Sequence, residues 1–207
     1  WANGETHRGM KARLAAIVDE LIPHTADRAR RVATRYLESW SSRGDFPWLA
    51  EFNGFTTDLF CEVFTGREIP EATDLFTAVL YGVDPFRKQS FERQAVTRED
   101  NVEEGQRAKK TLCDHVIASR GEAGAAFDAD LIVGAGGFAV IPALKNVLIN
   151  LYAQLSSKPA IRQRVIEELR ALPTPPTQEA LKDQTPYLDA CIYETIRLFP
   201  PVGHYYA

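Results

Sequence analysis

The sequence has 207 residues, of which 45% are apolar and 25% charged, a composition that suits one sizeable globular core. With 24 basic and 28 acidic residues the net charge is -4, and no basic stripe alternates with aromatic residues, so nucleic acid is not expected as a partner. No run of about 18 apolar residues occurs, which predicts a segment without a membrane span, located in the cytoplasm. The chain begins at Trp1 without a signal peptide, so we expect an excerpt of a longer protein, and an N-terminal anchor outside it stays open.

The first element is a helix whose opening turns carry His7 and Lys11. These residues are four apart, so both project from one helix face and could bind two neighbouring carboxylates. Arg13 lies off that face. The alternative is an exposed histidine beside a solvated lysine.

Apolar positions between Met10 and Leu21 recur at spacings of three and four, which predicts an amphipathic helix. Pro23 is expected to end it. A second, charged amphipathic helix is expected over residues 26–43.

The next helix carries an aromatic stripe from Phe52 to Phe64 and is expected to end at Gly66. We interpret the stripe as core rather than as a ligand-binding surface. A shorter helix is predicted over 71–81, followed by a long charged helix over about 88–120 that presents a solvated face.

A turn is expected over 121–126, and then an almost wholly apolar segment, 128–155, predicts a helix buried in a larger protein. Three glycines weaken this helix by about 0.8–1.0 kcal/mol each relative to alanine, and Pro142 removes a further hydrogen bond. Two explanations stay open. Either something approaches the backbone closely, or small residues allow a close helix–helix crossing.

The last helix ends in an unusual corner. Glu194 and Arg197 are three apart and share a face, so they can pair. Pro200 and Pro201 remove two donors and force Phe199 towards an extended conformation. An ion pair one turn before a double-proline stop predicts a rigid corner suited to holding another segment in place.

The segment YLDACIYETIRLFPPV, residues 187–202, resembles the Glu-x-x-Arg helix and exit of the cytochrome P-450 family, the haem-thiolate enzymes. In that family the Glu and Arg pair with a downstream Arg, which implies a structural brace formed by Glu194 and Arg197. NGETHRGMKARL, residues 3–14, resembles the haem-flanking helix, which implies propionate binding by His7 and Lys11. The resemblance also places the small residues of the central helix beside the haem: Ala135, Gly136 and Gly137.

The resemblance covers essentially the whole chain. It implies a mainly α fold: the middle portion of the cytochrome P-450 fold, in a single-domain fragment over 1–207, without the N-terminal part and the Cys-ligand loop. The implied cofactor is a b-type haem whose iron is held by a cysteine thiolate. Cys61, Cys113 and Cys191 lie on predicted helices rather than in such a loop, so we expect them to be reduced thiols and expect no metal ligand in this chain.

The central helix departs from the usual pattern of the family. Monooxygenases place an acid and a threonine after the small-Gly pair, whereas this chain has Phe138, Ala139 and Val140, none of which can relay a proton. GAGGFAVIPAL and PPVGHYYA are instead similar to the allene oxide synthase and hydroperoxide lyase branch, although Val133 stands where that branch has an asparagine. The resemblance implies a substrate pocket lined by four residues: Val133, Phe138, Val202 and His204.

The resemblance and the departures from it leave three possible functions open. The first is a monooxygenase acting on an apolar small molecule or lipid, with a ferredoxin or flavoprotein reductase as redox partner. The second is an enzyme that rearranges fatty-acid hydroperoxides and needs no reductase. The third is an all-α module that kept the fold and lost the haem. A reading frame that continues beyond Ala207 into a Phe-x-x-Gly-x-x-x-Cys-x-Gly loop would decide for an enzyme, and a stop codon would decide for the module.

Overall fold

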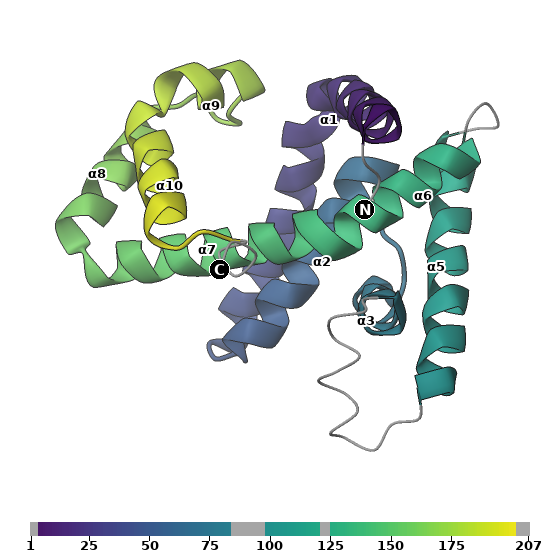
Figure 1. Cartoon of the computed structure of the whole chain (residues 1–207). Helices are drawn as coiled ribbons and strands as arrows, with labels where there is room; N and C mark the ends of the chain where they lie inside the picture. The colour runs from purple at the N-terminus through teal and green to yellow at the C-terminus, as the bar shows by residue number, and fades with distance from the viewer. Residues whose placement is uncertain (1–3, 84–97, 121–124, 202–207) are drawn as a thin grey trace. The chain divides into compact units, whose positions relative to one another are not determined.

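The computed structural model describes residues 4–83, 98–120 and 125–201. Most residues in these ranges are helical and none of them forms a strand, which confirms the mainly α fold. The chain divides into two compact units, Trp1–Ile141 and Pro142–Ala207, each described below by itself. The first unit contains these helical elements (Figure 1): α1 (Glu5–Arg43), α2 (Trp48–Thr65), α3 (Ala72–Val83), α5 (Arg98–Arg120), α6 (Ala125–Ala135) and the π-helical turn η2 (Gly136–Val140).

Helix α1 is continuous from Glu5 to Arg43, so the expected break at Pro23 is wrong. A proline inside a helix typically costs about 3 kcal/mol because it removes one hydrogen bond and crowds the preceding turn. Here Leu21 before the proline and Val32 after it are both buried. Packing on both sides of Pro23 therefore outweighs the local preference, and α1 bends along its length (Figure 1).

Helix α2 ends at Gly66 as predicted. Gly66 has φ 74°, a left-handed conformation that favours glycine, and its N–H donates to the carbonyl of Glu62 at 2.8 Å. The guanidinium of Arg28 lies against the same glycine and donates to the carbonyl of Val63 at 2.5 Å. The last turn of α2 is thus capped by the backbone N–H of Gly66 and by the Arg28 side chain of α1.

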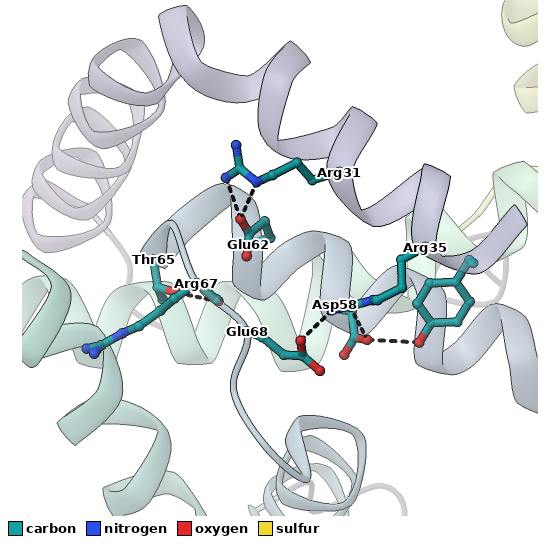
Figure 2. Close-up of polar contacts among 8 residues, drawn as sticks. Arg31, Arg35, Asp58, Glu62, Thr65, Arg67 and Glu68 are labelled. Atoms are coloured by element: carbon teal, nitrogen blue, oxygen red, sulfur yellow. Dashed lines mark hydrogen bonds and ion pairs between the residues drawn. The ribbon is translucent and has the colours of Figure 1, made fainter. Parts of the chain in front are cut away.

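Ion pairs join the second half of α1 to α2 (Figure 2). Arg31 binds Glu62 at 2.5 Å, and Arg35 binds Asp58 at 2.8 Å. The hydroxyl of Tyr36 also donates to Asp58, at 2.9 Å. These arginines are half-exposed, so the network fixes the register of the two helices more than it stabilises them.

The aromatic stripe of α2 is core, as expected. Phe52 is stacked on Trp40 of α1, with ring centroids 5.4 Å apart. Phe60 lies edge-on to Phe76 of α3, at 5.6 Å. The buried core that continues from there draws on α1, α2, α3, α5 and α6: Ile17, Leu21, Phe60, Cys61, Ile69, Ala72, Phe76, Val79, Ala108, Leu112, Val116, Ala129, Ile132, Val133 and Ile141.

The expected helix over 71–81 is found as α3, which packs against α5. The charged helix expected over 88–120 is found as α5 from residue 98, and residues 84–97 lie outside the described residues. Part of the turn expected over 121–126 is helix instead, because α6 begins at Ala125; residues 121–124 are not among those described.

Up to residue 201, the second unit contains the helices α7 (Ile141–Ser157), α8 (Pro159–Arg170), α9 (Gln178–Gln184) and α10 (Pro186–Leu198). Helices α8 and α10 pack against each other. In the ranges that the structure describes, none of the helices combines the length and the apolar character that a membrane crossing requires.

Candidate functional site

The first turns of α1 carry the two residues expected to bind propionates. His7 is half-buried and Lys11 is exposed, and they follow each other at helical spacing. Neither side chain forms a hydrogen bond or ion pair with any residue that the structure describes. Both side chains therefore remain available to an acidic ligand, and their propionate role stays a prediction.

Arg13, the neighbouring base, has a partner that the sequence did not reveal. Its guanidinium donates two hydrogen bonds to the Asp128 carboxylate, from Nε at 2.7 Å and from Nη2 at 2.5 Å. The Asp128 side chain is only 3% exposed. The hydrogen bonds from Arg13 hold the pKa of Asp128 below its ordinary value, although burial opposes this shift.

Two further charges complete a cluster around this pair. Arg120 of α5 lies with its Nε 3.7 Å from Asp128 and donates from Nη2 to Glu20 at 2.7 Å. Glu20 and Arg13 are both on α1, two turns apart. We call Arg13, Glu20, Arg120 and Asp128 the Asp128 clamp. It ties the first half of α1 to the start of the central helix and to the end of α5.

The central helix contains the small residues expected beside a cofactor. Gly136 and Gly137 are buried in η2. A Cβ on Gly136 would overlap the ring of Phe60, and one on Gly137 would lie 3.3 Å from Cδ1 of Phe76. Of the two explanations for these glycines, the structure supports the close helix crossing, because aromatic side chains of α2 and α3 fill the space.

The opposite side of the same segment is open. A Cβ added to Gly134 meets no atom within 4 Å, Ala135 is half-buried and Ala139 is exposed. The π-helical turn lies directly after Ala135, and such turns occur frequently at functional sites. A flat ligand could therefore approach the helix at Ala135. Whether Ala135, Gly136 and Gly137 contact haem stays a prediction.

The expected pocket residues are distributed unevenly. Val133 is 1% exposed and belongs to the core of the first unit. Phe138 lies in η2, but its side chain is outside the described residues, as are Val202 and His204. Their role towards a substrate remains an expectation.

In the second unit, the expected brace pair is formed. Arg197 donates to Glu194 from Nε and from Nη2, both at 2.7 Å. Helix α10 ends at Leu198, directly before the double proline as predicted, and Phe199 has left the helical conformation (φ -132°, ψ 75°). The side chains of Arg197 and Glu194 are 67% and 54% exposed. Both are thus free to meet a further segment.

Two contacts of the second unit position this corner, and sequence reasoning missed both. The Glu168 carboxylate of α8 accepts the N–H of Tyr187 at 2.9 Å and that of Leu188 at 2.8 Å, so it caps the first turn of α10. The amide of Asn146 on α7 donates to the carbonyl of Pro201 at 3.4 Å. A Glu that lies many residues before the helix it caps carries no local sign of such a role.

The side chains present fit part of a haem site. His7 and Lys11 suit two acidic groups, and the open side at Gly134 suits a flat ring. The three thiols do not form a loop ligand for the iron, because Cys61, Cys113 and Cys191 all lie within helices. Burial raises the pKa of Cys61 to about 12 and also raises the pKa of Cys113 and Cys191. Among the described residues no group of three or more His, Cys, Asp or Glu side chains could hold a metal ion.

Comparison with known proteins gives one kind of match. No protein-family model matches the chain, and no curated protein sequence does. In contrast, the structure is similar to that of retinoic acid-bound cyanobacterial CYP120A1, with a TM-score of 0.65 and 24% sequence identity. The match covers 97% of this chain and 50% of that chain, so this chain spans about half the length of its structural neighbour.

The chain therefore has the fold of an internal part of a cytochrome P-450, as the sequence predicted. This assignment rests on the structural similarity to CYP120A1. At this level of identity the similarity defines the fold and leaves activity, substrate and partner to be proposed.

Proposed function

We propose that this chain is the middle part of a haem-thiolate oxidoreductase of the cytochrome P-450 type. The observation that carries the proposal is the fold match over 97% of the chain. The bidentate Glu194–Arg197 pair at the double-proline corner supports it, because a brace of this kind has a purpose when a cofactor loop is present.

In this proposal the residues of the chain have distinct roles. His7 and Lys11 would bind the haem propionates, and Ala135 would lie against the ring. When bound, the haem supplies redox chemistry at its iron, held by a thiolate from outside this segment. Glu194 and Arg197 would meet a further basic segment of the fold and hold the cofactor loop in place.

The substrate class is an apolar small molecule or lipid. The central segment supplies aliphatic and aromatic side chains, and ligand pockets are lined mainly by such residues. The structural neighbour is described as bound to retinoic acid, which is an apolar carboxylic acid. We rank monooxygenation first, with a ferredoxin or flavoprotein reductase as redox partner.

A second function is favoured by one specific observation. The π-helical turn has the sequence GGFAV and contains neither an acid nor a hydroxyl. Activation of dioxygen requires two protons, whereas rearrangement of a hydroperoxide consumes none and needs no external electrons. The absence of a relay group in this turn therefore supports a hydroperoxide-rearranging enzyme as the second candidate.

Two measurements test these proposals. The full-length protein, reduced and exposed to carbon monoxide, is expected to give the red-shifted Soret band of a thiolate-ligated haem. The 207-residue chain, reconstituted with haem, is the control and is expected to lack that band. A full-length protein that takes up no haem would leave the non-catalytic module as the function.

The reaction type is decided by adding a fatty-acid hydroperoxide to the full-length protein without reductase or NADPH. We expect no loss of the conjugated-diene absorbance, and NADPH-dependent product formation once a reductase is added. Rapid loss of the diene absorbance would instead make the hydroperoxide-rearranging reaction the function.

A further inference from the structure

The Asp128 clamp is the strongest set of charges in the first unit that the proposed function leaves unused. Asp128 is 3% exposed, and Arg120 is 15% exposed. A buried carboxylate left without partners is costly, so it needs the guanidinium groups that surround it. The contacts link residues 115 positions apart in the sequence.

The clamp lies between the two parts of the first unit that are expected to face the cofactor. On α1, Arg13 follows Lys11 by two residues and His7 by six. On α6, Asp128 precedes Ala135 by two helical turns. Helices α1 and α6 pack against each other in this unit (Figure 1), and the Arg13–Asp128 pair is the bidentate contact that joins them.

The clamp also fixes the rotation of α1 about its own axis. Arg13 and Glu20 are seven residues apart and so lie on one face, and both are held, by Asp128 and by Arg120 respectively. Two contacts on one face restrain α1 against rotation about its axis. The direction in which His7 and Lys11 project follows from this constraint.

We propose that the Asp128 clamp positions the first turns of α1, and with them His7 and Lys11, for binding an acidic cofactor. Arg13 and Asp128 are positioning residues here and do not contact the cofactor themselves. The part of this inference that concerns the cofactor rests on the proposed function. The part that concerns the first turns of α1 does not.

The test compares Asp128→Asn and Arg13→Gln with the control Arg35→Gln. Arg35 is also an α1 arginine bound to a carboxylate of another helix, but it contacts α2 and lies far along α1 from His7. We expect amide hydrogen exchange in residues 5–13 to become about tenfold faster in both clamp variants and to stay unchanged in the control. Arg13→Lys keeps the positive charge but cannot make the two-pronged contact of a guanidinium. Its exchange rate in residues 5–13 is expected to lie between those of the wild type and Arg13→Gln.

The second readout is the rate at which the haem-loaded full-length protein releases haem to apomyoglobin. Release is expected to be faster in the clamp variants and unchanged in Arg35→Gln.

Unchanged hydrogen exchange in residues 5–13 would overturn the positioning role, whatever the rate of haem release. Faster exchange with unchanged haem release would overturn the link to the cofactor. A wild-type protein without haem would refute the proposed function, while the exchange data would still decide the role of the clamp. Should Asp128→Asn not fold, Arg13→Lys decides the outcome, because it keeps a cation beside the 3% exposed Asp128 carboxylate and removes only the forked contact.

Discussion

Each of the two units of this chain contains an arginine–carboxylate pair with two parallel hydrogen bonds. The two pairs differ in the sequence separation of their residues and in their exposure to solvent. Arg13 and Asp128 join helices that are 115 residues apart, and the carboxylate is 3% exposed. Glu194 and Arg197 are three residues apart on one helix, and both are more than half exposed. The first pair holds tertiary structure together, whereas the second is preformed by its own helix and waits for a partner. Similar bond lengths therefore carry very different consequences for stability.

The largest effect is expected at the long-range pair. Asp128→Ala leaves Arg13 without its acceptors and is expected to destabilise the chain by about 2 kcal/mol, less than a fully buried pair would lose because Arg13 is partly exposed. Urea unfolding followed by tryptophan fluorescence measures this loss. A loss of stability no larger than that expected for an exposed ion pair would remove the contrast between Arg13–Asp128 and Glu194–Arg197.

The next effect extends the contrast to glycines of the central helix. Gly136→Ala forces a Cβ into Phe60, which is buried, and overpacking of this kind costs about 1–3 kcal/mol. Gly134→Ala is the matched control, since its Cβ meets open space and should gain up to about 1 kcal/mol of helix propensity. Thermal unfolding of the two variants should shift in opposite directions. Shifts of the same sign would show that local propensity, rather than contact with Phe60, sets the stability there.

A smaller, local effect is expected at the start of α10. Glu168→Gln keeps one acceptor but removes the charge that accepts the N–H groups of Tyr187 and Leu188, and helix caps are worth about 1 kcal/mol. Hydrogen exchange at these two amides should become several-fold faster. Glu167→Gln is the control, because Glu167 accepts only from the side chain of Gln163 in a neighbouring turn. Equal acceleration in both variants would indicate a general effect of charge on α8.

The pH dependence separates Asp128 from Asp58, a carboxylate whose shift has the opposite sign. The pKa of Asp128 is lowered by hydrogen bonds from Arg13, so its stabilisation is present above the unfolded pKa of about 3.9 and is lost as the pH falls through the folded value. Burial raises the pKa of Asp58, so its contribution is present at low pH and is lost as the pH rises through the folded value. Asp128→Asn should therefore flatten the acid limb of the stability profile, and Asp58→Asn should steepen it.

The smallest effect is expected at the local pair. Arg197→Ala in the 207-residue chain should leave thermal unfolding unchanged, because both side chains are solvated. In the full-length protein we predict that Arg197 is buried against its further partner, so the same substitution should prevent haem incorporation. Unchanged haem content there would reduce the pair to a surface contact in both settings.

The sequence predicted the features that depend on neighbours in the chain. Gly66 ends α2, the double proline ends α10, and Glu194 pairs with Arg197, because each outcome is decided within one or two turns. The same locality explains the error at Pro23, where burial of residues on both sides outweighs a local penalty.

Contacts between distant segments could not be predicted in the same way. Asp128 looked like an ordinary acid at the start of a helix, and nothing near it points to Arg13. The glycines of η2 signalled a close approach, but their spacing did not say that Phe60 and Phe76 make it. The sequence thus located the sensitive positions of the central helix without identifying what they touch.

The three thiols give the chain a set of built-in labels. Cys61 is 1% exposed, and its pKa of about 12 keeps it protonated, so alkylating reagents can reach it only when the first unit opens. Cys191 lies half-buried on α10 of the second unit, and Cys113 half-buried on α5. The rate of alkylation at each position, read by mass spectrometry, therefore reports opening of the first unit at Cys61 and of α10 at Cys191, without any added probe.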